Sequence, residues 1–107
     1  MAELGNPKNT IEVLQKYQFH FAKKFGQNFL IDTHVLDKIV RAAEITPEDY
    51  VLEIGPGIGT LTQYLCESAK HVFAVEIDDN LIPILQDTLS AYDNVMIINE
   101  DVLKVDI

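Results

Sequence analysis

The sequence predicts an α/β fold with a parallel sheet, because three short apolar runs alternate with two segments of helical character. The runs occupy residues 50–52, 72–75 and 95–98, and helices are expected near 60–67 and 78–89. Short, continuously apolar strands separated by helices are typical of parallel sheets. Their crossovers are right-handed, and the first three strands of a doubly wound sheet lie in the spatial order 3-2-1. We therefore expect the N-terminal half of a Rossmann-like, doubly wound domain.

Each predicted strand ends in glycine or in carboxylate side chains. The first run continues into Glu53-Ile54-Gly55-Pro56-Gly57-Ile58-Gly59, the second into Glu76-Ile77-Asp78, and the third into Asn99-Glu100-Asp101. In open parallel sheets, ligands bind just beyond the carboxyl ends of the strands. The sequence therefore predicts a nucleotide-type pocket with glycine backbone on one wall and acidic side chains on the other.

The spacing of the glycines indicates which kind of nucleotide the pocket takes. A dinucleotide-binding loop reads G-x-G-x-x-G/A, but its third position falls on Thr60, since glycines stand at 55, 57 and 59. The arrangement E-x-G-x-G-x-G instead resembles motif I of S-adenosylmethionine-dependent methyltransferases. That cofactor has no phosphate, and glycine lets the backbone pass close to its aminoacyl arm because glycine lacks a Cβ. A nicotinamide-dependent oxidoreductase domain is the alternative from another class.

Three acidic residues are candidates for ligand contact or for support of the loop. Glu76, at the end of the second strand, is interpreted as the acceptor of two hydrogen bonds from a ribose diol. Asp101, after the third strand, is interpreted as an acceptor for an adenine amino group. Glu53 lies inside a strand, where a carboxylate needs partners, so we expect it to shape the turn through loop amides. Asp78 and Asp79 are expected to cap the following helix.

Two helices are expected before the sheet. Asn9 or Thr10 is predicted to cap the first, with Pro7 just outside it, and Asp32 or Thr33 is predicted to cap the second. The second helix carries an apolar stripe at helical spacing, made of Val35, Leu36, Ile39, Val40 and Ala43.

The segment Phe25-Gly26-Gln27-Asn28-Phe29-Leu30 carries a second signal. It reads as a loop in which two phenylalanines hold two polar amides beside a core. Either the loop is an anchored connection, or the amides of Gln27 and Asn28 meet the carboxylate and ammonium of a methionine moiety. The residues alone leave both interpretations open.

Charge is distributed unevenly along the chain. The 107 residues have a formal net charge of −9; residues 1–24 are net +2, with four lysines against two glutamates, and residues 25–107 are net −11. A body this acidic is a poor surface for nucleic acid. We therefore expect residues 1–24 to form a basic N-terminal arm, mobile without RNA, that matters for RNA binding and not for folding. Residues 25–107 are expected to form a partial cofactor-binding domain.

Composition sets further limits. The single cysteine, Cys66, cannot form an internal disulfide. The N-terminus lacks the layout of a signal peptide, and no apolar run approaches the ~18 residues of a membrane helix. These features predict a cytoplasmic location and no membrane contact. The three histidines lack the spacing of metal ligands, so no metal site is expected.

Together these motifs resemble the ribosomal RNA adenine N6-dimethyltransferase family. The resemblance covers about residues 10–107 and is carried by the segments 24–32, 51–62, 75–78 and 100–102. It implies an S-adenosylmethionine-dependent enzyme of ribosome biogenesis that methylates two adjacent adenosines of 16S rRNA in the small ribosomal subunit. The erythromycin-resistance enzymes, which act on 23S rRNA, share the motifs and are the close alternative.

The resemblance also implies roles for individual residues. Its cofactor contacts fall on Asn28, Leu30, Gly55, Glu76 and Asp101, with additional neighbours at Gln27, Gly57 and Ile77. The family's catalytic motif, Asn-Leu-Pro followed by Tyr or Phe, comes after strand four, and none of the four prolines here lies in such a motif. The family's C-terminal helical domain for RNA docking is likewise not expected within these 107 residues. No catalytic residue is therefore expected in this chain, and a non-catalytic binding chain is a further alternative.

The first strand is expected to present a free edge. In a doubly wound sheet the fourth strand pairs with the first, and these 107 residues contain no fourth strand. Unpaired apolar strands recruit other chains. We therefore expect the chain to self-associate through residues 50–54.

Overall fold

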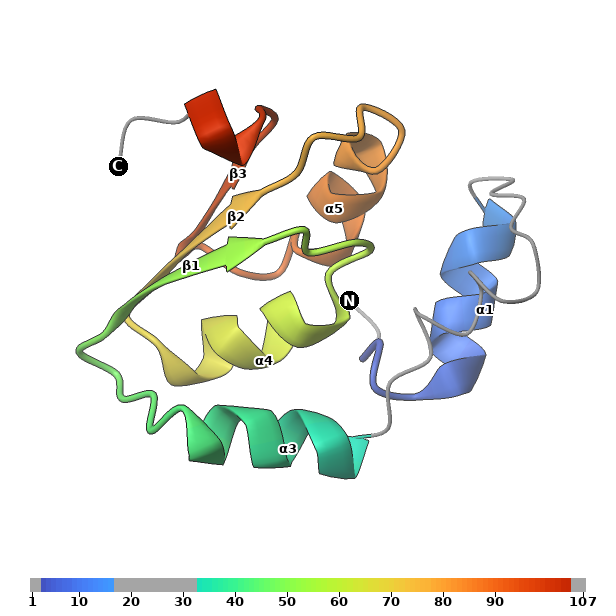
Figure 1. Cartoon of the computed structure of the whole chain (residues 1–107). Helices are drawn as coiled ribbons and strands as arrows, with labels where there is room; N and C mark the ends of the chain where they lie inside the picture. Colours follow the sequence, from blue (N-terminus) through green and yellow to red (C-terminus); the bar gives the residue numbers. More distant parts are fainter. Residues whose placement is uncertain (1–2, 17–32, 105–107) are drawn as a thin grey trace.

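The structure is a computed structural model of the chain, and it describes residues 3–16 and 33–104 (Figure 1). Within these residues the elements, in chain order, are helices α1 (Pro7–Lys16) and α3 (Thr33–Ala42), strand β1 (Tyr50–Ile54), helix α4 (Thr60–Ser68), strand β2 (His71–Val75), helix α5 (Ile82–Thr88), strand β3 (Val95–Ile98) and the 3-10 turn η2 (Val102–Lys104). The alternation of strands and helices predicted from the sequence is confirmed.

The described strands form one parallel sheet in the order β1-β2-β3, so the predicted order 3-2-1 is confirmed. Two rows of side chains run across it in register. We call them the inner row (Val51, Val72, Val95) and the outer row (Leu52, Phe73, Met96). Because successive side chains of a strand point to opposite faces, the two rows lie on opposite faces of the sheet.

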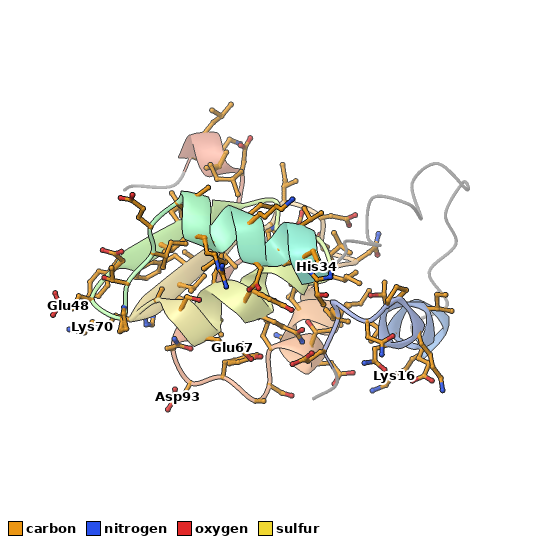
Figure 2. All side chains as sticks on the ribbon, turned by 90° about the horizontal axis from the view of Figure 1, so that it is seen from below. Lys16, His34, Glu48, Glu67, Lys70 and Asp93 are labelled. Atoms are coloured by element: carbon orange, nitrogen blue, oxygen red, sulfur yellow. The ribbon has the colours of Figure 1, made fainter. Side chains whose placement is uncertain are left out.

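The inner row faces the helices. Helix α4 packs on β2, α5 packs on β3, and α3 packs on α4. Viewed from below, α3 lies in front of α4 and of the sheet (Figure 2). Val72 is fully buried, and Leu65, Cys66 and Ala69 pack against it. This burial raises the pKa of the Cys66 thiol to about 12, with Glu53 and Glu67 adding to the effect, so Cys66 serves as a small core residue.

The outer row is open to solvent. Leu52 is 42% exposed and Met96 is 52% exposed. Tyr50, on the same face, is 67% exposed, and the Lys70 ammonium lies 5.7 Å from the centre of its ring. The sheet therefore presents one covered apolar face and one exposed apolar face.

The described part of the N-terminal arm is packed into the core. Leu4 is fully buried and lies in a cluster with Ile58, Leu81 and Ile84. The expectation that this arm does not matter for folding is therefore wrong at Leu4 and Thr10, which are fully buried. The proposed boundary after residue 24 lies outside the described residues.

Helix α1 begins earlier than predicted, and a different residue caps it. The Asn6 side-chain Oδ1 accepts a hydrogen bond from the Lys8 N–H at 3.0 Å, as an N-cap does. Pro7 occupies the first helical position, where its fixed φ and missing N–H are tolerated. Thr10, predicted as a possible cap, lies inside the helix and donates its hydroxyl proton to the Leu4 carbonyl at 2.8 Å.

The apolar stripe of α3 is covered only in part. Leu36 is fully buried, but Val35 and Ile39 are 47% and 41% exposed, because α3 packs mainly on one helix, α4. Thr33 is the first residue of α3, and Asp32 lies outside the described residues. No helix in the ranges 3–16 and 33–104 is long and apolar enough to cross a membrane.

Helix α5, in contrast, begins later than expected. Asp78 forms a turn before it, since its Oδ1 accepts a hydrogen bond from the Asn80 N–H at 2.9 Å. The N-cap position falls on Leu81, so the prediction of an aspartate cap is wrong. Pro83 lies in the first turn, where backbone N–H groups lack helical partners.

Candidate functional site

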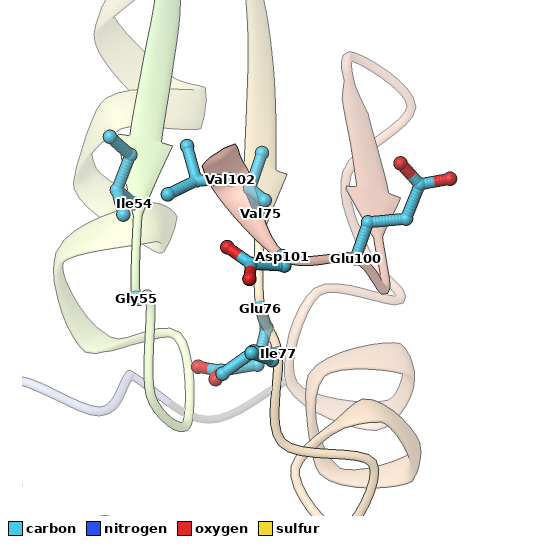
Figure 3. A pocket seen from close by; sticks show the side chains of 8 residues that line it. All are labelled: Ile54, Gly55, Val75, Glu76, Ile77, Glu100, Asp101 and Val102. Carbon is cyan, nitrogen blue, oxygen red and sulfur yellow. The ribbon is translucent and has the colours of Figure 1, made fainter. Parts of the chain in front are cut away.

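The carboxyl ends of the three strands surround a hollow of about 120 Å³ (Figure 3). It is lined by Ile54, Gly55, Val75, Glu76, Ile77, Glu100, Asp101 and Val102. Ligand pockets usually measure ~300–1,000 Å³. The described residues therefore form one part of a small-molecule site, at the place where open parallel sheets bind their ligands.

The glycine loop, residues 55–59, forms one wall. Gly55 has φ +72° and Gly59 has φ +97°, in the left-handed region that favours glycine. The Gly55 N–H donates to the Val75 carbonyl at 2.9 Å, which continues the pairing of β1 with β2 beyond Ile54. A Cβ built on Gly55 would meet nothing within 4 Å. This part of the loop consequently offers bare backbone to an open space.

Glu76 connects the loop to the end of β2. Its side chain is 6% exposed, so it is not a solvated strand-end acid. One oxygen accepts a hydrogen bond from the Gly57 N–H at 3.3 Å, and the other accepts one from the Asp78 N–H at 3.1 Å. A carboxylate offers about four lone-pair sites, so each oxygen keeps capacity for a further donor. The carboxylate is thus held in place before any ligand arrives.

Asp101 and Glu100 differ in orientation. The Asp101 carboxylate points into the space between the ends of β1 and β2, whereas the Glu100 carboxylate points away from it (Figure 3). Asp101 Oδ1 accepts a hydrogen bond from the Leu103 N–H at 3.0 Å, which begins the turn η2. Among the described residues, no backbone N–H donates to the other oxygen, Oδ2. Ile77 lies next to Glu76 and is 65% exposed, an apolar surface beside a polar acceptor.

Glu53 makes a contact to helix α4 in place of the predicted contact to the glycine loop. Its carboxylate accepts a hydrogen bond from the Thr62 hydroxyl of α4, whereas loop amides had been expected. Burial raises the pKa of the Glu53 carboxyl, the Thr62 hydrogen bond opposes this rise, and the negative charge of Glu76 adds to it. Glu53 is absent from the lining of the hollow.

The structure brings together four of the eight predicted site residues: Gly55, Glu76, Ile77 and Asp101. Gly57 joins them through its hydrogen bond to Glu76. Gln27, Asn28 and Leu30 lie outside the described residues. The remaining lining residues, Ile54, Val75, Glu100 and Val102, were not among the predicted contacts; Ile54 and Val75 are the last residues of their strands, a position that could have identified them.

The arrangement suits a nucleoside-type ligand. It combines bare glycine backbone, a fixed buried carboxylate and an exposed isoleucine at one sheet edge. Among residues 3–16 and 33–104, no group of three or more histidine, cysteine, aspartate or glutamate side chains is placed to hold a metal ion.

Solved structures identify the class of the fold. The chain is 37% identical to the 23S rRNA methyltransferase ErmE, with a TM-score of 0.66 over 71% of this chain and 31% of that one. It is also 37% identical to a dimethyladenosine transferase from Plasmodium falciparum, with a TM-score of 0.64 over 69% of this chain and 28% of that one. The fold is the Rossmann-like fold of the S-adenosylmethionine-dependent methyltransferases.

Sequence comparison narrows the class to a family. The model of the ribosomal RNA adenine dimethylase family matches residues 18–107, so the chain belongs to that family.

Relatives match at higher identity over nearly the whole chain. The chain is 78% identical over 108 residues to the ribosomal RNA small subunit methyltransferase A of Lachnoclostridium phytofermentans, covering 100% of this chain and 37% of that protein. It is 59% identical over 105 residues to the enzyme of the same name from Bacillus pumilus, covering 98% and 36%. The chain thus spans little more than a third of the length of these relatives.

Proposed function

We propose that this chain is the cofactor-binding part of an S-adenosylmethionine-dependent enzyme that dimethylates N6 of two adjacent adenosines in 16S rRNA. The observation that carries the proposal is the buried Glu76 carboxylate, fixed by the Gly57 and Asp78 amides at the end of β2. A carboxylate so placed, with unused lone pairs, matches the two hydroxyls of a ribose. The exposed backbone of Gly55 beside it leaves room for the aminoacyl arm.

Each proposed contact follows from the position of its residue. Glu76 accepts from the ribose diol, and Asp101 uses the oxygen that Leu103 leaves free to accept from the adenine amino group. Ile77 packs on the adenine ring, and Gly55 and Gly57 border the methionine moiety. Three further contacts proposed for the same ligand, Gln27, Asn28 and Leu30, are not among the described residues.

The choice of 16S over 23S rRNA rests on the relatives. Proteins named for the small ribosomal subunit match this chain at 54–78% identity, against 37% for the 23S rRNA enzyme ErmE. A cytoplasmic location follows from a ribosomal substrate. RNA contact is proposed for the basic N-terminal arm: Lys23→Glu with Lys24→Glu should weaken subunit binding in a salt-dependent manner, as phosphate contacts require.

Catalysis is proposed to need residues beyond these 107. Adenine N6 must be flipped out of its stack and held, and the chain has no Asn-Leu-Pro-aromatic motif for that purpose. The 107-residue chain should therefore give no dimethyladenosine when mixed with undermethylated small subunits and cofactor. Formation of the product would show that a catalytic site lies within it.

We also propose that the 107-residue chain self-associates. Strand β1 lies at the edge of the described sheet, with Tyr50 67% and Ile54 61% exposed. Unpaired, apolar strand edges pair with other chains.

Calorimetry on the complete polypeptide encoded by the gene tests the cofactor. S-adenosylhomocysteine should bind more tightly than NAD; the reverse order would favour the oxidoreductase alternative. Glu76→Gln should weaken binding by about 1.5–3 kcal/mol, the scale for hydrogen bonds to a charged group. Glu100→Gln removes the same charge from the residue that points away from the hollow, and should leave binding nearly unchanged. Equal effects of the two substitutions would contradict the assignment of Glu76.

A further inference from the structure

The glycine loop has a hydrogen bond to helix α5 in addition to the one that links it to Glu76. One residue after the Gly57–Glu76 contact, the Ile58 carbonyl accepts a hydrogen bond from the Thr88 hydroxyl of α5 at 2.8 Å. The contact is tight: a Cβ built on Gly59 would lie 2.9 Å from that same hydroxyl oxygen. Thr88 is fully buried and Ile58 is 1% exposed. The loop therefore has two polar anchors on different elements.

The Thr88 anchor is one link in a buried relay of hydrogen bonds. The Thr88 carbonyl accepts from Gln63 Nε2 at 2.9 Å, and Gln63 Oε1 accepts from the Leu4 N–H at 2.9 Å. The Leu4 carbonyl in turn accepts from the Thr10 hydroxyl at 2.8 Å. The residues of this relay, Leu4, Thr10, Gln63 and Thr88, are each at most 3% exposed. Buried polar networks of this kind fix one arrangement, because an unmade bond in the interior is costly.

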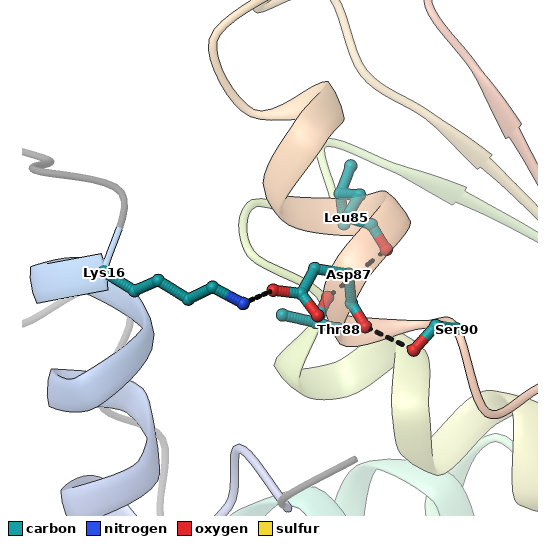
Figure 4. A network of polar contacts seen from close by, with 5 residues as sticks. All are labelled: Lys16, Leu85, Asp87, Thr88 and Ser90. Carbon is teal, nitrogen blue, oxygen red and sulfur yellow. Dashed lines mark hydrogen bonds and ion pairs between the residues drawn. The ribbon is translucent and has the colours of Figure 1, made fainter.

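The N-terminal segment that supports the relay is fixed at both ends. At Gly5, a Cβ would lie 2.6 Å from Thr33 Cγ2, so the chain passes here against α3. At the far end of α1, Lys16 Nζ pairs with Asp87 Oδ2 at 2.6 Å, one residue before Thr88 (Figure 4). Residues 4–10 are therefore in contact with α3 at Gly5 and with α4 through the Leu4–Gln63 hydrogen bond.

We propose that Thr88 and Gln63 are positioning residues for the glycine loop, and that residues 4–10 support them. Neither side chain lines the hollow. Their effect passes through the Ile58 carbonyl, whose direction orients the following peptide and hence Gly59. The inference rests on the proposed function, because its consequence is that affinity for the cofactor depends on Thr88 and Gln63, which do not touch the cofactor.

The test compares Thr88→Val, which removes the hydroxyl, with Thr88→Ser, which keeps it. In the complete polypeptide, Thr88→Val should weaken S-adenosylhomocysteine binding about tenfold, and Thr88→Ser should restore it to within about twofold of the original. Ser90→Ala is the matched control, since the Ser90 hydroxyl donates to the Asp87 carbonyl outside the relay. It should leave binding unchanged.

A second readout needs no ligand. In Thr88→Val, amide hydrogen exchange at Gly57 and Gly59 should become faster, with the amide of Val75 in β2 as the internal reference. In Thr88→Ser it should stay as in the original protein. Thr10→Val removes the last hydrogen bond of the relay. It should also speed exchange at Gly57 and Gly59 and weaken binding, but less than Thr88→Val does. This variant provides the test if Thr88→Val does not fold.

Two failures are distinguishable. A lower melting temperature with unchanged binding and unchanged Gly57 and Gly59 exchange would overturn the positioning role and leave the proposed function standing. Absence of S-adenosylhomocysteine binding by the unsubstituted protein would overturn the proposed function, and the exchange measurement would still decide whether the relay positions the loop.

Discussion

The two faces of the sheet are made from the same strands and meet opposite environments. In the inner row, Val72 is fully buried beneath α4. In the outer row, Met96 is 52% exposed and Leu52 is 42% exposed, although each follows an inner-row residue directly in the sequence. An apolar residue in these strands therefore signals a buried environment only when an element of the structure covers its face.

The comparison explains why the strands lack an alternating pattern. A sheet with one wet face normally alternates apolar and polar residues, whereas these strands are apolar on both faces. The outer row thus has the composition of a surface that is meant to be covered. This difference between composition and exposure is what the following experiments address.

The largest expected effect separates the two faces by stability. Leu85, in α5, is fully buried, so Leu85→Ala should lower the free energy of unfolding by about 2–5 kcal/mol. Leu52→Ala removes the same atoms from the exposed face and should cost less than about 1 kcal/mol in the 107-residue chain. Urea unfolding measures both. Equal costs would mean that the outer face is covered in solution.

Association of the 107-residue chain should depend on the outer face. Leu52→Lys places a charge in the outer row on the edge strand β1 and should reduce light scattering at micromolar concentration, because pairing through β1 would have to bury the ammonium. Gln86→Lys adds the same charge at an exposed position of α5 and should change scattering little. A monomer before any substitution, with a cooperative melt, would refute the proposed association.

A half-buried carboxyl on the inner face, Glu53, should make the free energy of unfolding depend on pH. Burial raises the pKa of Glu53, so the folded chain retains a proton at pH values where the unfolded chain has released it. The contribution of Glu53 to stability therefore falls as pH rises above its unfolded pKa. The free energy of unfolding of Glu53→Gln, relative to that of the original chain, should therefore be higher at pH 8 than at pH 5. Both pH values lie above the unfolded pKa of ~4.3. Urea titrations at both pH values, with Glu100→Gln as the charge control, measure this; a relative gain toward acid pH would contradict it.

The smallest effect on stability is expected for the exposed ion pair between α1 and α5, on the helix-covered side of the sheet. The Lys16–Asp87 pair is exposed, with 63% of the lysine side chain accessible, so Lys16→Met should cost about 0.5 kcal/mol. Lys8→Met, in the same helix, serves as control. Thermal unfolding in low and high salt gives the comparison. A cost that persists in high salt would indicate that packing of the lysine stem matters more than its charge.

Local signals in the sequence were sufficient for the sheet and for part of the site. The apolar runs and the glycine loop predicted the strands, their order and the edge at which Gly55, Glu76 and Asp101 meet. Each of these depends on residues that are close in the chain or on rules that all parallel sheets share. The same reasoning failed at helix caps, where Asn6 and Leu81 replaced the predicted residues.

The tertiary structure alone decided what holds the loop. Thr88 reaches Ile58 across 30 residues, and Gln63 reaches Leu4 across 59. No periodicity marks such contacts, because a threonine or glutamine in a helix reads as a surface residue until its partner is known. Burial of these polar groups is favourable only when every donor and acceptor is matched, and that match exists only once α1, α4 and α5 are packed together.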